Sequence, residues 1–352
     1  MQSSGEAVVN LTVGNRAPPI IGANLSGRFY SHDAQAGRPL ALVALGVLEP
    51  DHLAAALDRL QACRAALARG GVDLVILLPF SARYAAAVSD HAAADLVIHI
   101  NDGSGLDRLQ QDGRPGLAVL DRGWRLVHVG AFGPETDLAA LCAFLAPQLA
   151  SEAGRLCTAS APVLIVPNVL APDACRALIA HFEASPHRPG VMASMQGDAA
   201  VAKLDESKKK RRDLELTAET PLHAEIVRVL AERLAPEIKR AFQFDVAFAD
   251  RILLARYDDT GGYFRRHRDN AAAHTAFRDF AVSINLNTPD YEGGELLFPE
   301  YNDHRHSPPA GGALVFSASI LHEAAPVTRG QRYVALSFLS GPTAQARLSQ
   351  AA

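Results

Sequence analysis

The stretch Tyr263-Phe264-Arg265-Arg266-His267-Arg268-Asp269 contains an imidazole and a carboxylate two residues apart. A second histidine, His322, lies further along the chain, and Arg332 follows it. Two imidazoles and one carboxylate make a facial triad, which holds Fe(II) on one face and leaves other coordination positions open. A guanidinium offers a planar pair of donors to a carboxylate. His267, Asp269 and His322 are therefore candidate metal ligands, and Arg332 is a candidate anion-binding residue.

The surrounding sequence predicts a β-rich fold. A His-x-Asp tripeptide carries little weight by itself. Short apolar runs separated by Gly, Pro, Asn and Asp flank the triad, at 252–257, 280–287, 294–298, 313–317 and 332–338. Such runs are typical of a jelly roll (a double-stranded β-helix), where residues distant in sequence meet at the mouth of the barrel. We predict that the triad and Arg332 converge there, as in an oxygenase that uses Fe(II) and the dicarboxylate 2-oxoglutarate.

Residues 251–339 resemble the prolyl 4-hydroxylase-like family of Fe(II)/2-oxoglutarate dioxygenases. The matching pieces are Tyr257 ten residues before His267, Asn270 after the His-x-Asp pair, Gly293-Gly294-Glu295-Leu296, and the segment 322–333. The resemblance implies that His267, Asp269 and His322 ligate iron and act in catalysis.

The resemblance also assigns the co-substrate contacts. It implies that Arg332 holds the distal carboxylate of 2-oxoglutarate and that Tyr257 lies beside the co-substrate. Some relatives carry a second tyrosine or a threonine on the following strand; here Ser283 and Asn285 are nearest, and we expect Asn285 to contact the co-substrate. Arg329 is a rival to Arg332, although it falls in a turn rather than in a strand.

The implied reaction consumes O2 and 2-oxoglutarate, releases succinate and CO2, and hydroxylates an unactivated C–H bond; ascorbate is open as an accessory reductant. The substrate is expected to be a peptide, a protein or an amino-acid-like small molecule. The arginines around the first ligand pair favour an anionic substrate or form a solvated strand face: Arg256, Arg265, Arg266 and Arg268. Candidates to orient the imidazoles are Asn270, Ser319 and Glu323.

Length and composition set wider limits. A chain of 352 residues is long enough for two domains, and a net charge of −4 gives no general basic field for nucleic acid. No apolar run is long enough to cross a membrane, and the first residues lack a secretory pattern. The four cysteines have no metal-binding spacing, which favours reduced thiols and a cytoplasmic protein: Cys63, Cys142, Cys157 and Cys175.

Residues 1–150 alternate predicted strands (40–45, 72–78, 96–100, 116–120, 125–129) with predicted helices (51–69, 81–91, 136–149). This order predicts an α/β domain with a mixed sheet and helices on both faces. The order of these elements and the opening segment 13–19 resemble a thioredoxin-fold domain of the peroxiredoxin type. A thiol peroxidase needs a reactive cysteine after its first buried strand, but residues 46–51 have none. We predict a redox-inactive scaffold for folding, homodimerisation or substrate presentation.

The segment 151–162 is predicted to be a linker, and 163–345 the jelly-roll domain with flanking helices at 171–184 and 220–241, the latter interrupted near Pro236. The basic run Lys208-Lys209-Lys210-Arg211-Arg212 is predicted to be a loop, either solvated or gripping an acidic or phosphorylated substrate.

Two other functions stay open from the sequence. One is a thiol peroxidase that uses Cys63, although the position of Cys63 deep in a predicted helix favours a small core residue. The other is a metal-binding interaction module without turnover. Peroxide consumption that depends on Cys63 would favour the first, and iron binding without co-substrate decarboxylation would favour the second.

Overall fold

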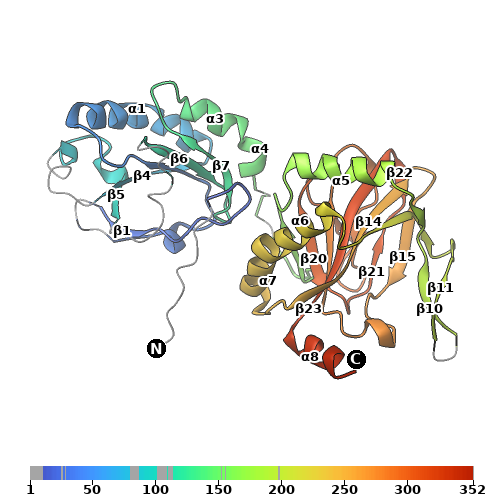
Figure 1. Cartoon of the computed structure of the whole chain (residues 1–352). Helices are drawn as coiled ribbons and strands as arrows, with labels where there is room; N and C mark the ends of the chain where they lie inside the picture. Colours follow the sequence, from blue (N-terminus) through green and yellow to red (C-terminus); the bar gives the residue numbers. More distant parts are fainter. Residues whose placement is uncertain are drawn as a thin grey trace. The chain divides into compact units, whose positions relative to one another are not determined.

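The computed structural model describes residues 11–24, 27, 29–79, 87–100, 109, 114–151, 153–154, 156–196 and 199–351. The chain forms two compact units, Met1–Gly154 and Arg155–Ala352, each with its own sheets (Figure 1). The division falls within the segment 151–162. No helix in the described ranges is long and apolar enough to cross a lipid bilayer.

The first unit is built on a seven-stranded mixed sheet in the order β2-β1-β5-β4-β3-β6-β7. Its central strands β3 and β4 are parallel, and β6 and β7 run antiparallel beside them. The strands are β1 (Ile21–Ala23), β2 (Phe29–Ser31), β3 (Leu40–Ala44), β4 (Asp73–Pro79), β5 (Val97–Ile100), β6 (Gly116–Leu120) and β7 (Leu126–Ala131). The helices are α1 (Pro50–Arg69), α3 (Leu138–Phe144) and α4 (Ala146–Leu149), with 3-10 turns at His32–Gln35 and Ala94–Leu96.

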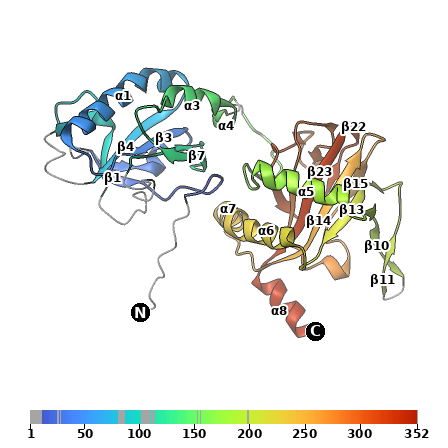
Figure 2. The same ribbon diagram turned by 45° about the horizontal axis from the view of Figure 1, so that its top comes forward.

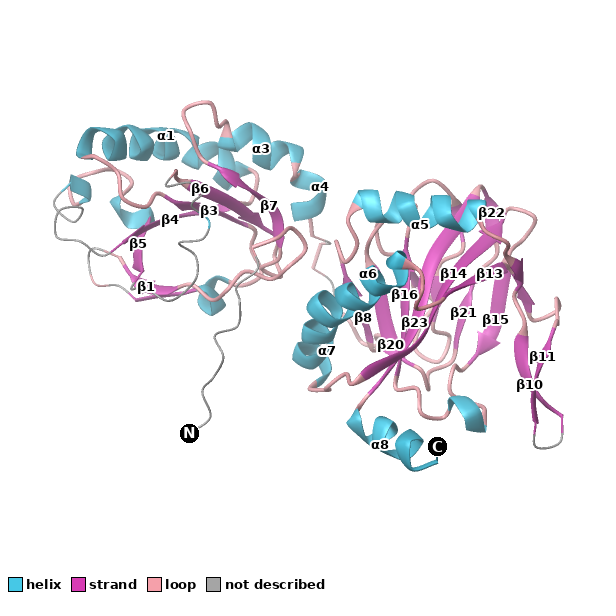
Figure 3. Ribbon diagram, viewed as in Figure 1, coloured by secondary structure: helices cyan, strands magenta, loops and turns pink. Residues whose placement is uncertain are grey.

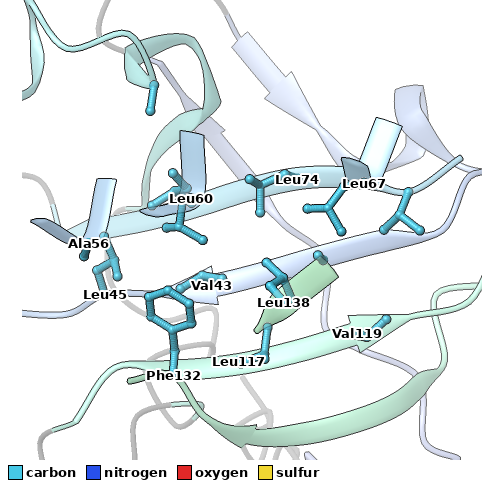
Figure 4. Packing of buried hydrophobic residues seen from close by; sticks show 14 of the residues in the cluster. Val43, Leu45, Ala56, Leu60, Leu67, Leu74, Leu117, Val119, Phe132 and Leu138 are labelled. Atoms are coloured by element: carbon cyan, nitrogen blue, oxygen red, sulfur yellow. The ribbon is translucent and has the colours of Figure 1, made fainter. Parts of the chain in front are cut away.

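Helices α1 and α3 cover one face of this sheet. Leu53, Leu57 and Leu60 recur at helical spacing along α1 and are fully buried against the strands. Figure 4 shows Leu60 and Leu67 of the helix packed over Val43 and Leu74 of the sheet. The opposite face buries a second cluster under the segment 11–20 and Leu109. The described residues therefore place α-helices on one face only, and the helix predicted at 81–91 falls largely outside them.

The second unit contains two antiparallel sheets, consistent with the predicted jelly roll. The larger has the order β8-β20-β16-β23-β14-β13-β9, and the smaller β12-β15-β21-β18-β19. The larger comprises β8 (Val163–Val166), β9 (Arg188–Pro189), β13 (Arg212–Leu216), β14 (Phe248–Asp258), β16 (Phe280–Asn285), β20 (Ala313–Ser317) and β23 (Gln331–Ser340). The smaller comprises β12 (Lys209–Lys210), β15 (Tyr263–His267), β18 (Leu296–Leu297), β19 (Arg305–His306) and β21 (His322–Ala324). Two ribbons complete it: β10 (Met192–Gln196) with β11 (Ala199–Lys203), and β17 (Glu292–Gly293) with β22 (Val327–Arg329).

The larger sheet is buried on both faces, because side chains alternate along each strand. On β14, Leu254 packs toward the helices, whereas Ala255 and Tyr257 belong to the cluster shared with the smaller sheet. This double burial explains why its central strands read as continuous apolar runs rather than alternating ones. The flanking helices lie together on one side of the sheet (Figures 2 and 3).

These helices are α5 (Pro172–Ala184), α6 (Pro221–Val229) and α7 (Ala235–Phe242), and α8 (Pro342–Ala351) follows the last strand. A π-helical turn, Leu230–Leu234, joins α6 to α7 directly before Pro236. Proline has no N–H to donate back along the helix, so the change of pitch falls where the sequence predicted an interruption.

The basic run 208–212 is not the loop that the sequence predicted. Lys209 and Lys210 form β12, which pairs with Phe264 and Tyr263 of β15, and Arg212 begins β13. Lys209 is only 5% exposed. Its buried Nζ donates to Asp213 Oδ2 at 3.0 Å and to the carbonyl of Val191 at 3.0 Å. The run therefore builds two strands beside the triad instead of a solvated segment.

Candidate metal and co-substrate site

The three candidate metal ligands meet between neighbouring strands of the smaller sheet. His267 at the end of β15 is the cross-strand partner of His322 at the start of β21. Nε2 of His267 lies 3.5 Å from Asp269 Oδ1, and Nε2 of His322 lies 3.3 Å from Asp269 Oδ2. One ligand atom from each residue falls within 4.8 Å of the others. This donor set suits Fe(II), with two imidazoles and one carboxylate on one side of the ion.

Backbone carbonyls orient both imidazoles. Nδ1 of His267 lies 2.7 Å from the carbonyl of Arg265, and Nδ1 of His322 lies 3.1 Å from the carbonyl of Ile320. A carbonyl only accepts, so each Nδ1 donates to its carbonyl, and each Nε2 faces Asp269. The side chains expected to orient them lie elsewhere: Asn270 donates to Ser319 Oγ and to the carbonyl of Arg278.

The protonation states also suit a metal. Burial lowers the pKa of His322 to about 4, so this imidazole is neutral near pH 7. Burial alone would raise the pKa of Asp269, but the hydrogen bond to His267 and the nearby charges of His322, His267 and Arg278 hold it below its usual value. The site thus offers an ionised carboxylate from Asp269 beside the neutral imidazole of His322.

The triad and Arg332 both line a cavity of about 60 Å³. Arg332 is 3% exposed, and its Nη2 donates to Asn285 Oδ1 at 3.1 Å and approaches Ser283 Oγ at 3.5 Å. Its buried Nε has no hydrogen-bond partner among the described residues. A buried, incompletely paired guanidinium fits a carboxylate ligand, because a carboxylate would satisfy the remaining donors.

Two other residues that the sequence offered for co-substrate binding, Asn285 and Arg329, do not line this cavity. The Nδ2 of Asn285 is used by Pro308 and neighbouring hydroxyls, and its Oδ1 holds Arg332. Ser283 is the polar residue of that strand at the cavity wall. Arg329 is exposed and pairs with Glu292 at 2.6 Å, so Arg332 is the buried member of the pair of candidates.

The sequence did not indicate Arg211, which lies on the cavity wall beside Tyr257. Nη1 of Arg211 donates to the Tyr257 hydroxyl at 2.8 Å, and its Nε donates to Asp213 at 2.6 Å. Arg332 approaches the same ring, with Cζ 5.2 Å from the centroid. The one available signal was the alternation Lys209-x-Arg211-x-Asp213, which places these three side chains on one face of an extended segment.

A wider cleft of about 1200 Å³ opens over the triad. It is bordered by β9, β12 and β15, and Phe264 and Phe338 line both the cleft and the inner cavity. Of the four arginines around the first ligand pair, three line it: Arg265, Arg266 and Arg268. Arg256 instead pairs with Glu183 at 2.7 Å and with Asp258 at 2.8 Å.

Cys63 of the first unit has none of the features of a reactive thiol. It lies in the middle of α1, and its Sγ donates to the carbonyl of Leu60 at 3.1 Å. Burial raises the pKa of the Cys63 thiol, whereas a nucleophilic cysteine needs a lowered one. Burial also raises the pKa of Cys142 to about 11.

Comparison with known proteins places the second unit among oxygenases. Residues 252–340 match the 2OG-Fe(II) oxygenase superfamily. A PKHD-type hydroxylase of Methylobacterium nodulans is 32% identical over 181 residues, which are 48% of this chain and 74% of that protein. Another, from Polaromonas sp., is 28% identical over 140 residues, or 36% of this chain and 62% of that protein, so the chain spans less than two thirds of this relative. A crystal structure of a Pseudomonas putida prolyl-4-hydroxylase covers 52% of this chain and 94% of its own, with 18% identity and a TM-score of 0.41.

Proposed function

Because this chain belongs to the 2OG-Fe(II) oxygenase superfamily, we propose that its second unit is an Fe(II)- and 2-oxoglutarate-dependent dioxygenase. Its reaction hydroxylates an unactivated C–H bond of a peptide, a protein or an amino-acid-like small molecule, and releases succinate and CO2. The observation that carries the proposal is the pairing of a His-Asp-His cluster with a buried, incompletely paired arginine in the adjoining cavity.

Each part of the site has a role in this proposal. His267, Asp269 and His322 would hold Fe(II), and Arg332 would bind the distal carboxylate of 2-oxoglutarate, with Asn285 fixing the guanidinium. When bound, the metal and co-substrate supply the oxidising power that an unactivated C–H bond requires.

Aromatic and hydroxyl groups complete the site. The Phe264 ring stacks on His267 with centroids 3.5 Å apart, and the Phe316 ring meets His322 at 4.6 Å. These rings fix the imidazole planes and exclude water from one side of the metal position. The hydroxyl oxygen of Tyr257 accepts a hydrogen bond from Arg211. The hydroxyl hydrogen of Tyr257 would therefore be free to donate to the co-substrate.

Succinate formation tests the proposal. Protein incubated with Fe(II), 2-oxoglutarate and O2 should form succinate even without a prime substrate, at a slow uncoupled rate, and ascorbate should prolong that turnover. His267→Ala and Asp269→Ala should each abolish it. Iron binding without succinate formation would favour a metal-binding module in place of an enzyme.

We further propose that the first unit is a thioredoxin-like domain of the peroxiredoxin type that lacks the redox reaction. Its strand order and the depth of Cys63 in α1 support this. Peroxide should therefore not be consumed by the wild type beyond the level of Cys63→Ala. A thiol-dependent peroxidase activity that Cys63→Ala removes would contradict the proposal.

A further inference from the structure

The cleft above the triad is strongly cationic, although the whole chain has a net charge of −4. Nine Lys or Arg residues line it against four Asp or Glu residues. One of these four, Asp269, belongs to the triad. The positive charge is therefore concentrated at the position where a substrate must enter.

The remaining acidic residues of the cleft already have partners. Asp213 pairs with Lys209 and Arg211, Glu215 pairs with Arg251 at 2.9 Å, and Glu323 lies 3.6 Å from Arg266. In addition, Arg268 pairs with Glu300 at 2.6 Å.

Three exposed cations of the cleft have no carboxylate partner among the described residues: Arg188 of β9, Lys208 before β12 and Arg265 of β15. The guanidinium of Arg265 lies over the ring of Tyr263, with Cζ 4.3 Å from the centroid.

Lys208 and Arg265 face each other across the ladder between β12 and β15. The N–H of Arg265 donates to the carbonyl of Lys208 at 2.8 Å, next to the cross-strand pair Lys209 and Phe264. Like charges opposite each other on neighbouring strands destabilise a sheet. An anionic ligand bound at this border of the cleft would relieve the repulsion between the two cations.

We propose that this cleft binds an acidic, extended peptide segment, whose carboxylates contact Arg188, Lys208 and Arg265. The inference deepens the proposed function and rests on it for the chemistry at the metal. A cleft of about 1200 Å³ exceeds the usual size of a small-metabolite pocket, roughly 300–1,000 Å³. β9 and β12 are the terminal strands of their sheets and both border the cleft, so an extended chain can run along them.

The cleft also has an apolar floor next to the metal position. Phe264, Leu336 and Phe338 line both the cleft and the inner cavity. A side chain that descends between them reaches the triad, while flanking carboxylates stay at the cationic border. The cleft therefore selects substrates whose acidic residues flank the residue that is hydroxylated.

Fluorescence anisotropy of the full chain tests the inference without turnover. The probes are fluorescein-labelled Glu-Ala repeat peptides, with Gln-Ala and Lys-Ala repeats of equal length for comparison. Glu-Ala should bind, the other two should not, and binding should weaken as salt is added. Lys208→Glu and Arg265→Glu should each weaken Glu-Ala binding by about five-fold or more at low salt.

The matched control is Arg240→Glu, which makes the same charge change at an exposed position on α7 away from the cleft. Equal losses in all three variants would show a general charge effect and overturn the inference, as would equal binding of the three peptides. Tighter binding of a dT oligonucleotide than of Glu-Ala would also overturn it, in favour of nucleic acid. Lys208→Gln and Arg265→Gln should give smaller losses, and thermal unfolding confirms that each variant is folded.

Failure of the proposed function is distinguishable from failure of this inference. Lys208→Glu should retain wild-type uncoupled succinate formation, because Lys208 does not line the inner cavity. Succinate formation without selective peptide binding contradicts only the substrate class. Selective peptide binding without succinate formation contradicts the enzymatic proposal and leaves a peptide-binding cleft.

Discussion

The guanidinium of Arg211 donates a 2.8 Å hydrogen bond from Nη1 to the hydroxyl oxygen of Tyr257. The two residues are far apart in the sequence, and the pairing of β13 with β14 brings the end of the basic run beside Tyr257. Asp213 holds the other side of the guanidinium at 2.6 Å. Burial alone would lower the pKa of Arg211, but Asp213 and Tyr257 outweigh it and raise the pKa, so Arg211 stays charged.

Arg211→Gln should raise the KM for 2-oxoglutarate by about ten-fold, because Tyr257 loses the charged donor that orients its hydroxyl. Fe(II) affinity should change less, since Arg211 has no hydrogen bond to a triad residue. Tyr257→Phe should have a similar effect, and the double variant should be no worse than either single one. Additive effects in the double variant would remove Arg211 from this role. The control is Lys210→Gln, because the Nζ of Lys210 donates to the carbonyl of Thr260 rather than to Tyr257.

Gly294 leaves room for the clamp on the co-substrate. A Cβ on Gly294 would lie 2.7 Å from Cδ of Arg332, and its φ of +71° disfavours other residues. Gly294→Ala should therefore displace Arg332 and weaken 2-oxoglutarate binding by about ten-fold or more, measured by calorimetry. Gly261→Ala separates strain from displacement, because Gly261 has a φ of +83° and nothing within 4 Å of its Cβ position. Equal losses in both variants would argue against displacement.

Arg332 and Arg329 should behave differently, although the sequence made them rivals. Arg332→Ala should raise the 2-oxoglutarate requirement by about 100-fold, because it removes a charge-assisted, bidentate partner in a buried site. Arg329→Ala should leave it unchanged, since Arg329 is exposed and pairs with Glu292. The two KM values for 2-oxoglutarate decide the point, and an unchanged KM in Arg332→Ala would contradict the assignment.

The metal-free protein should lose stability as the pH falls from about 6.5 toward 4. The folded pKa of His322 is about 4, whereas an exposed histidine titrates near 6.5. The unfolded chain takes up this proton first, so the free energy of unfolding decreases across that window, by up to about 3 kcal/mol. Asp269, with a lowered pKa, adds a loss only at still lower pH.

Urea unfolding at a series of pH values measures this dependence. His322→Gln should flatten it, whereas His274→Gln, at an exposed position, should not. An equal slope in the wild type and in His322→Gln would show that another group is responsible.

Apolar runs and ligand spacing made much of the second unit predictable. The runs at 313–317 and 332–338 coincide with β20 and β23, because strands buried on both faces leave an uninterrupted apolar signature. His267 and His322 could be paired as candidates because strand-like apolar runs surround both of them.

The prediction of a loop for the basic run 208–212 was wrong, because a cluster of charged residues suggests exposure to solvent when the sequence does not show which residues pair with them. Asp213 lies close in sequence, but Tyr257 reaches Arg211 only through the sheet. The orientation of the imidazoles was unpredictable for another reason. Backbone carbonyls, which every residue has, hold Nδ1 of both rings, whereas the sequence offered Asn270, Ser319 and Glu323 as candidates.

The most direct measurement of the central claim is an anaerobic titration of the metal-free protein with Fe(II) and 2-oxoglutarate, followed by visible absorption. The account predicts a charge-transfer band that needs both ligands, saturates at equimolar Fe(II), and is absent from His322→Ala. No band in the folded wild type, or an undiminished band in His322→Ala, would contradict an iron and 2-oxoglutarate site built on His267, Asp269 and His322.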